Sequence, residues 1–250
     1  MTYEQPLNER MRTFLRLNFL FDQAEFHASG ESTWESRAAI SSLLDVLAIL
    51  SRGDVRQEVI KELERYSSEL LQFRAQPGVD RQRLDDVLDE ITSILKGLEV
   101  AGSTIMQRLK ESDFLNAVRH RSAIPGGTCE FDLPDYRHWL GLAYEQRLAD
   151  FNSWIERVRP LRLGVQKVLW LLRESAQSQA QTARAGMFQH VLERGMSVQL
   201  LRVSVRNDAD VFPEISGSQH RFTVRFHTWQ DVGSRPAQST DDINFFLACC

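Results

Sequence analysis

Apolar residues follow two different periods along the chain. Through the first two-thirds they recur every three or four residues, which is the spacing of one face of an α-helix. From about residue 198 they alternate with polar residues, as in β-strands with one buried face. Helices followed by strands indicate an α+β protein. We predict an N-terminal, mostly helical domain over 1–180 and a C-terminal antiparallel β-sheet domain over 181–250.

The helical pattern carries start and stop signals. Asn8 and Asp80 suit the N-cap position, and Pro77 with Gly78 breaks a helix. Pro160 suits the first turn of a helix, so we expect it to separate two helices. The predicted helices span 8–26, 36–50, 55–74, 80–96, 101–110, 112–121, 141–158 and 160–178.

The strand pattern is concentrated near the C-terminus. The alternating segments are 198–205, 220–227 and 243–248. Pro213 lacks an N–H group, which makes 212–215 an edge strand. Residues 128–133 also form a short strand pattern that Pro134 ends, and we expect this strand to join the later sheet. The polar stretch 231–241 is predicted to be a loop.

Composition and charge exclude several classes of protein. The net charge of −4 disfavours binding to nucleic acid. No run of apolar residues is long enough to span a membrane. The first residues lack the basic and apolar regions of a secretory signal, so we expect a cytosolic protein. The three cysteines, Cys129, Cys249 and Cys250, do not make a disulfide framework.

No catalytic or metal-binding motif stands out. The chain has no Gly-x-Ser-x-Gly, Walker, His-Glu-x-x-His or Gly-x-Gly-x-x-Gly sequence. The glycine-rich run at 125–128 lacks a lysine and precedes a predicted strand, so we interpret it as a turn. The cysteines and histidines lack metal-ligand spacing. We therefore expect no enzyme activity, no cofactor and no metal.

Arginine is the most informative residue type. It supplies 26 of the 30 basic residues, and its planar fork suits carboxylate recognition, although a GC-rich genome would also favour it. In the strand pattern at 220–227, Arg221 and Arg225 share the face opposite the phenylalanines, about 13 Å apart. Arg12 and Arg16 share a helix face, where either Glu9 or a partner could offset their repulsion. The alternative is that such arginines are solvated or pair with the 34 acidic residues.

Several stretches, in order along nearly the whole chain, resemble the ZapD family of bacterial division proteins, which bind the tubulin-like GTPase FtsZ. The resemblance is carried by Pro6–Arg16, Leu43–Leu47, Arg52–Arg56, Pro77–Asp80, Ile124–Pro134, Ile215–Gly217, Arg221–Phe226 and Leu247–Cys250. The chain departs from the family pattern at Asp113 and near Arg137 and His138.

This resemblance implies a homodimer that binds the acidic C-terminal tail of FtsZ. Two such sites would cross-link and bundle FtsZ filaments, and so promote Z-ring assembly and septation at midcell. The family's pocket arginines match Arg16, Arg52, Arg221 and Arg225, to which we add Arg119 and Arg121. The alternative hypotheses are an enzyme or ligand-binding protein with a site between the helical and β parts, and a nucleic-acid-binding module.

Overall fold

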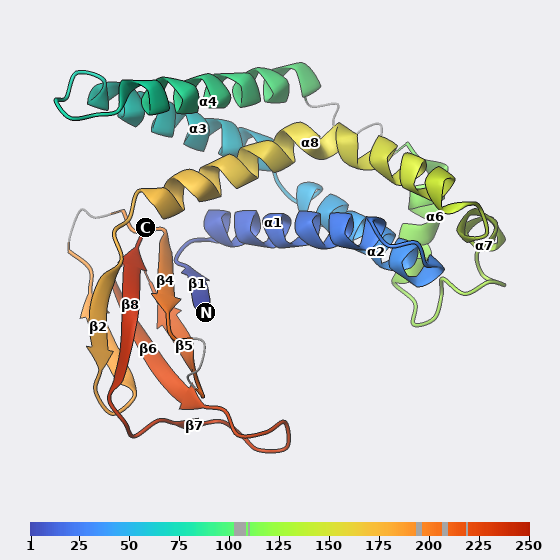
Figure 1. Ribbon diagram of the computed structural model, residues 1–250. Coiled ribbons are helices and arrows are strands. Elements are labelled where there is room, and N and C mark those ends of the chain that lie inside the picture. The colour runs from blue at the N-terminus through green and yellow to red at the C-terminus, as the bar shows by residue number, and fades with distance from the viewer. Residues whose placement is uncertain (103–108, 110, 194–196, 207–209, 219) are drawn as a thin grey trace. The chain divides into compact units, whose positions relative to one another are not determined.

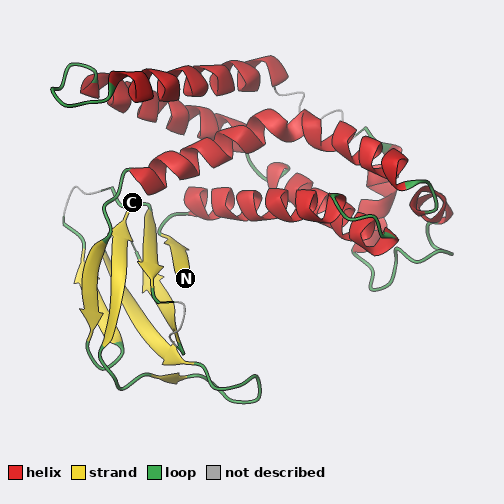
Figure 2. Cartoon of the chain, viewed as in Figure 1, coloured by secondary structure: helices red, strands yellow, loops and turns green. Residues whose placement is uncertain are grey.

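The computed structural model describes residues 1–250 except 103–108, 110, 194–196, 207–209 and 219. These residues form two compact units, one joining 1–13 to 170–250 and the other containing 14–169. Figure 2 shows that the first unit holds the strands and the second is built of helices. Helices α1 (Glu9–Ala28) and α8 (Tyr144–Glu174) each run from one unit into the other. The predicted α+β class is confirmed.

The sheet unit contains two antiparallel sheets (Figure 1). Their strands are β1 (Thr2–Pro6), β2 (Gln179–Ala183), β3 (Met187–Val191), β4 (Leu200–Ser204), β5 (Val211–Gly217), β6 (Arg221–Thr228), β7 (Ala237–Gln238) and β8 (Ile243–Cys249). The first sheet has the order β1-β4-β8-β2. The second has the order β3-β6-β5, with β7 also paired to β6.

A core of apolar side chains joins the two sheets into a sandwich. Leu201, Val203 and Phe245 of the first sheet belong to the same buried cluster as Phe222 and Phe226 of the second. Alternate residues of β6 supply this core, as its period of two predicted. The opposite face of β6 is therefore turned away from the core.

The first strand was not predicted from the sequence. Thr2–Pro6 pairs with β4 in register, with Tyr3 opposite Val203, so the start of the chain belongs to the sheet unit. Our predicted helical domain over 1–180 had included it. Strands β2 and β3 were also missed, because most of their residues are exposed and polar positions break the apolar alternation.

The helical unit contains most of α1 and α8, together with α2 (Thr33–Leu50), α3 (Val55–Phe73), α4 (Arg81–Ala101), α6 (Asp113–Ser122) and α7 (Pro134–Leu140). Two predicted N-caps are confirmed. Asn8 accepts a hydrogen bond from the Met11 N–H at 2.8 Å, and Asp80 accepts one from Arg83 at 3.1 Å. Most of the helix predicted at 101–110 lies outside the described residues.

Two local predictions were wrong. Residues 128–133 form turns and no strand, because the Gly126 φ of 75° and local bonds such as Cys129 N–H to the Gly126 carbonyl coil the backbone on itself. Pro134 begins α7 and does not end a strand.

The second wrong prediction concerns Pro160, which lies inside the continuous helix α8 and does not separate two helices. Buried residues on both sides of it, including Val158 and Leu161, hold the helix in place despite the missing N–H bond.

Close packing of α8 against α3 depends on a glycine. A Cβ atom at Gly164 would lie 2.5 Å from Cγ1 of Val59, which is fully buried. Elsewhere on α8, the buried Arg147 donates hydrogen bonds to the Glu31 carbonyl at 2.6 Å and the Ser36 hydroxyl at 2.7 Å. The start of α2 is thereby tied to α8.

Candidate functional site

Strand β6 carries two exposed arginines on the face turned away from the sandwich core. Phe222, Val224 and Phe226 are buried, whereas Arg221 and Arg225 are exposed on the opposite side. The same-face relation inferred from the sequence therefore holds in the fold. Thr223 lies between the two arginines and is partly exposed. We call the surface defined by Arg221, Thr223 and Arg225 the arginine face.

Neither arginine of this face forms an ion pair within the part of the chain that the structure describes. Arg225 nevertheless has an acidic neighbour, because Glu214 of β5 lies directly opposite it on the adjacent strand. Its Oε2 lies 3.0 Å from Nε2 of His227, the next residue on the same side of β6. Glu214 is therefore directed to His227, and the guanidinium of Arg225 remains available.

A polar hollow adjoins the Arg221 end of the face. It has a volume of about 590 Å³, and Arg221, Thr223, Gln189 of β3 and Ser216 of β5 contribute to its lining. Gln189 and Ser216 flank Thr223 on either side in the strand register. The second sheet thus presents charge and hydrogen-bonding groups around a concave surface.

The remaining predicted site arginines lie in the helical unit. Arg16 on α1, Arg52 just after α2, and Arg119 in the last turn of α6 are all exposed. No hydrogen bond or ion pair of the described side chains joins these three residues, and none has an acidic partner there. Arg121 is different, because its Nη1 lies 3.6 Å from Oδ1 of Asp132.

Arg12, which shares a face of α1 with Arg16, and Arg137, where the chain departs from the family pattern, each have an acidic partner. Arg12 pairs at 3.1 Å with Glu9, the internal carboxylate that the sequence offered, and Arg16 has no acidic partner within the described part of the chain. Arg137 pairs with Glu130 at 3.1 Å. The structure therefore brings Arg221 and Arg225 onto one surface, while Arg16, Arg52 and Arg119 occupy separate elements of the other unit.

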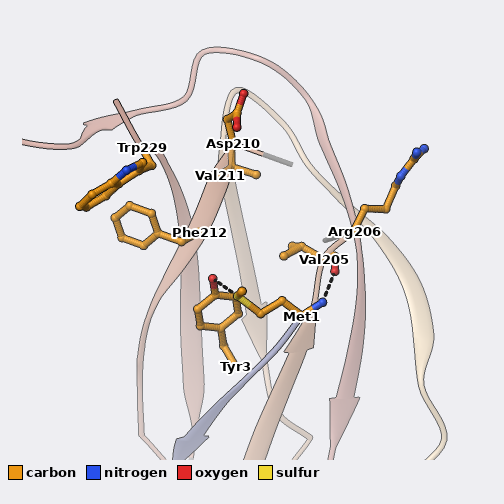
Figure 3. A pocket seen from close by; sticks show the side chains of 8 residues that line it. All are labelled: Met1, Tyr3, Val205, Arg206, Asp210, Val211, Phe212 and Trp229. Atoms are coloured by element: carbon orange, nitrogen blue, oxygen red, sulfur yellow. Dashed lines mark hydrogen bonds between the residues drawn. The ribbon is translucent and has the colours of Figure 1, made fainter. Parts of the chain in front are cut away.

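Sequence reasoning missed an aromatic pocket on the sheet unit (Figure 3). Phe212 of β5 and Trp229, which follows β6, form a T-shaped pair with ring centroids 6.4 Å apart. Tyr3 and Met1 also line the pocket, whose volume is about 440 Å³. The lining joins Met1 and Tyr3 to residues between 205 and 229, so no local pattern could have indicated it. We call this the aromatic pocket.

Among the described residues, no group of three or more His, Cys, Asp or Glu side chains is placed so that it could hold a metal ion. Cys249 and Cys250 are free thiols in the sheet unit. Burial raises the pKa of Cys250 to about 11 and also raises the pKa of Cys249. Both are therefore protonated near neutral pH and are poor nucleophiles. Among the described helices, none is both long and apolar enough to cross a membrane.

Comparisons with known proteins point to one family. The family model described as ZapD, a cell division protein, matches residues 15–225. A protein named cell division protein ZapD from Methylococcus capsulatus is 40% identical over 250 residues, which cover 100% of this chain and 98% of the relative. A protein of the same name from Aromatoleum aromaticum is 37% identical, over 100% of this chain and 97% of the relative.

Proposed function

Because the chain belongs to the ZapD family of cell division proteins, we propose that it binds the acidic C-terminal tail of FtsZ through its arginines. As a homodimer it would cross-link and bundle FtsZ filaments, and so promote Z-ring assembly and septation. It would act in the cytoplasm at midcell, as a binding protein and not an enzyme. The observation that carries this proposal is the pair Arg221 and Arg225, exposed on one face with no acidic partner among the residues that the structure describes.

The physical basis is charge-assisted hydrogen bonding. A guanidinium and a carboxylate form short, directional bonds that are roughly twice as strong as neutral ones. Two guanidinium groups about 13 Å apart can hold two carboxylates of one extended peptide. Arg16, Arg52, Arg119 and Arg121 of the helical unit are kept as further proposed tail-binding residues. Exposed charges are screened within about 8 Å at physiological ionic strength, so binding should weaken as salt is raised.

Cross-linking requires two binding sites in one particle. Two copies held together would each hold a tail, and the second attachment would benefit from high effective concentration. Exposed aromatic residues of the helical unit offer a surface for self-association. Phe19 and Phe26 lie seven residues apart on one face of α1 and are 63% and 75% exposed. Such side chains favour a protein contact.

The proposed binding is tested by co-sedimentation with FtsZ polymers. Wild-type protein should pellet with full-length FtsZ and not with FtsZ that lacks its C-terminal tail. Arg221→Glu should abolish pelleting without lowering the unfolding temperature. Arg159→Glu is the control, because Arg159 is equally charged, exposed on α8 and outside the proposed site. Pelleting that survives removal of the tail would refute tail binding.

The proposed dimer is tested separately by light scattering. The particle mass should be twice the 28.8 kDa of one chain. Phe26→Asp should lower the mass toward that of one chain if the α1 face forms the contact, while leaving the fold intact because Phe26 is exposed. A wild-type protein that is monomeric at all concentrations would remove the cross-linking mechanism, although tail binding could still be measured.

A further inference from the structure

Two residues of the aromatic pocket, Phe212 and Trp229, continue the row of side chains that forms the arginine face. The backbone N–H of Trp229 donates a hydrogen bond to the backbone carbonyl of Asp210 at 2.9 Å, so the pairing of β5 and β6 continues beyond Thr228. Trp229 therefore follows Arg225 and His227 in the same alternating series. Phe212 lies opposite His227 in the register, and their rings stack with centroids 5.7 Å apart. One surface thus leads from Arg221 through Arg225 and His227 to the pocket.

The side chains along this surface change from charged at one end to apolar at the other. Arg221 and Arg225 provide charge over the first part, and Phe212 with Trp229 provides an apolar concavity at the end. Residues of one strand face recur every two positions, so Arg225 and Trp229 are about 13 Å apart. This spacing equals four residues of an extended peptide. An extended ligand could place a carboxylate at Arg225 and a large side chain in the pocket.

The pocket has the properties of an anchor site. Trp229 is 51% exposed although it is a large apolar side chain, and Figure 3 shows its ring beside that of Phe212 with Tyr3 and Met1 close by. The Tyr3 hydroxyl donates to the Met1 sulfur at 2.9 Å, which fixes that side of the pocket. Buried aromatic anchors commonly contribute most of the binding energy of a peptide or protein contact.

Charged groups of both signs lie near the pocket, so its aromatic rings distinguish it from the arginine face. Asp210 lies at the pocket and is exposed, and Glu214 lies between the pocket and Arg225 on the same face. Arg206 and the N-terminal ammonium group of Met1 also line the pocket, so its charges are of mixed sign. The rings of Phe212 and Trp229 suit an apolar position of the ligand, and Arg225 and Arg221 suit its acidic positions.

The free edge of β5 disfavours a different mode of binding, in which a peptide adds to the sheet as a further strand. Since Asp210 and Trp229 form a hydrogen-bonded pair, the alternation of an antiparallel ladder turns the backbone groups of Val211, Pro213 and Ile215 toward the free edge. Pro213 offers no N–H at the centre of that edge. Recognition by side chains in the pocket is therefore favoured over strand addition.

We propose that the aromatic pocket binds a large apolar side chain of the same acidic tail that the arginine face binds, about four residues from the carboxylate at Arg225. This inference rests on the proposed function and specifies the partner further. The ligand is an extended peptide in which an apolar residue and acidic residues occur at a fixed separation. Negative charge alone is insufficient.

The test measures the affinity of the full-length protein for a fluorescent FtsZ tail peptide by polarisation. Trp229→Ala should weaken binding about tenfold, which is the loss of about 1.4 kcal/mol typical of an anchor residue. Trp229→Phe should restore most of the affinity. Phe246→Ala is the matched control, because Phe246 is 55% exposed on β8 and outside the pocket. Unfolding curves verify that each variant is folded.

A second set of peptides identifies the side chain that enters the pocket. Each large apolar residue of the tail is replaced by alanine in turn, and each peptide is measured against wild type and Trp229→Ala. One replacement should weaken binding to wild type about tenfold and have little further effect on Trp229→Ala, because the two changes remove the same contact. Additive effects at every position would overturn the pocket assignment.

The outcomes separate this inference from the proposed function. If Arg221→Glu loses binding while Trp229→Ala behaves as Phe246→Ala does, the pocket is wrong and tail binding by arginine stands. If the wild-type protein does not bind the tail peptide, the proposed function fails and the pocket assignment fails with it. If Trp229→Ala and one peptide replacement are coupled as described, both are supported.

Discussion

The two sheets of the sheet unit use arginine in opposite ways. On the first sheet, Arg202 of β4 and Arg173 at the end of α8 both donate to Glu4 of β1, at 3.1 and 2.7 Å. On the second, Arg221 and Arg225 have no acidic partner among the described residues, although Glu214 is adjacent. Arginine on the first sheet stabilises the fold, and arginine on the second is available to a ligand. Charge count alone would not have distinguished them.

The largest effect should come from reversing the charge of the arginine face. Arg221→Glu combined with Arg225→Glu should weaken binding of the FtsZ tail peptide by about 100-fold or more, because each contact between opposite charges becomes a repulsion. The free energy of unfolding should change little, because neither residue has an acidic partner to lose among the described residues. Peptide titrations at low and high salt measure the first effect, and urea unfolding measures the second. A large loss of stability would remove the contrast between the sheets.

The converse change on the first sheet should affect stability and not binding. Glu4→Ala leaves two partly buried guanidinium groups without their carboxylate and should lower the free energy of unfolding by about 1–3 kcal/mol. Urea unfolding followed by circular dichroism checks this. The affinity for the tail peptide should match that of wild type at a temperature where the variant is folded. An unchanged unfolding curve would show that the Glu4 cluster contributes no stability.

A smaller gain in affinity should follow from neutralising Glu214. Glu214→Gln removes a negative charge beside Arg225 and should strengthen tail binding about two- to fivefold at low salt, as expected for partly exposed charges. The gain should diminish at high salt, where the charges are screened. Glu156→Gln serves as control, because Glu156 is an exposed acid that pairs with Arg159 on α8. Equal gains in both variants would indicate a general effect of net charge.

The smallest predicted effect is a loss of stability at alkaline pH, caused by Cys250 just after β8 of the first sheet. The pKa of Cys250 is about 11 in the folded chain, above the 8.5 of a free thiol, because burial disfavours the thiolate. The folded state therefore holds this proton more tightly. Its contribution to stability is complete below about pH 8.5 and is lost as pH rises toward 11. Urea unfolding between pH 8 and 10 should show a decline that is smaller in Cys250→Ser. The pH is kept at or below 10 so that ionisation of Tyr136, whose pKa burial raises to about 12, does not contribute to the decline.

How far the sequence predicts this molecule depends on how local each determinant is. The N-caps at Asn8 and Asp80 involve residues three positions apart, and both were predicted correctly. The face shared by Arg221 and Arg225 follows from the period of a single strand and was also correct. In contrast, the course of α8 through Pro160 depends on packing along the whole helix, which the local rule for proline does not include.

The candidate site shows the same difference between local and distant determinants. Whether an arginine is paired or available depends on its neighbours in space, such as Glu4 for Arg202, which lie almost 200 residues away in sequence. The aromatic pocket likewise needs Tyr3, Phe212 and Trp229 from three segments. The positions of Arg16 and Arg119 on separate helices, and of Arg52 just after a third, could be inferred, but whether the three share a surface could not. The resemblance to ZapD supplied Arg16 and Arg52, to which we added Arg119, and the role of all three stays a prediction.

The pairing of β1 with β4 has a consequence for the order in which the protein is made. Thr2 lies opposite Ser204, so the first strand leaves the ribosome long before its partner does. The helical unit lies entirely between the two parts of the sheet unit and can fold during synthesis. The sheet unit must wait until residues near 250 have emerged, because β8 pairs with β4. A chain released before β8 has been made would thus lack the sandwich that supports the arginine face.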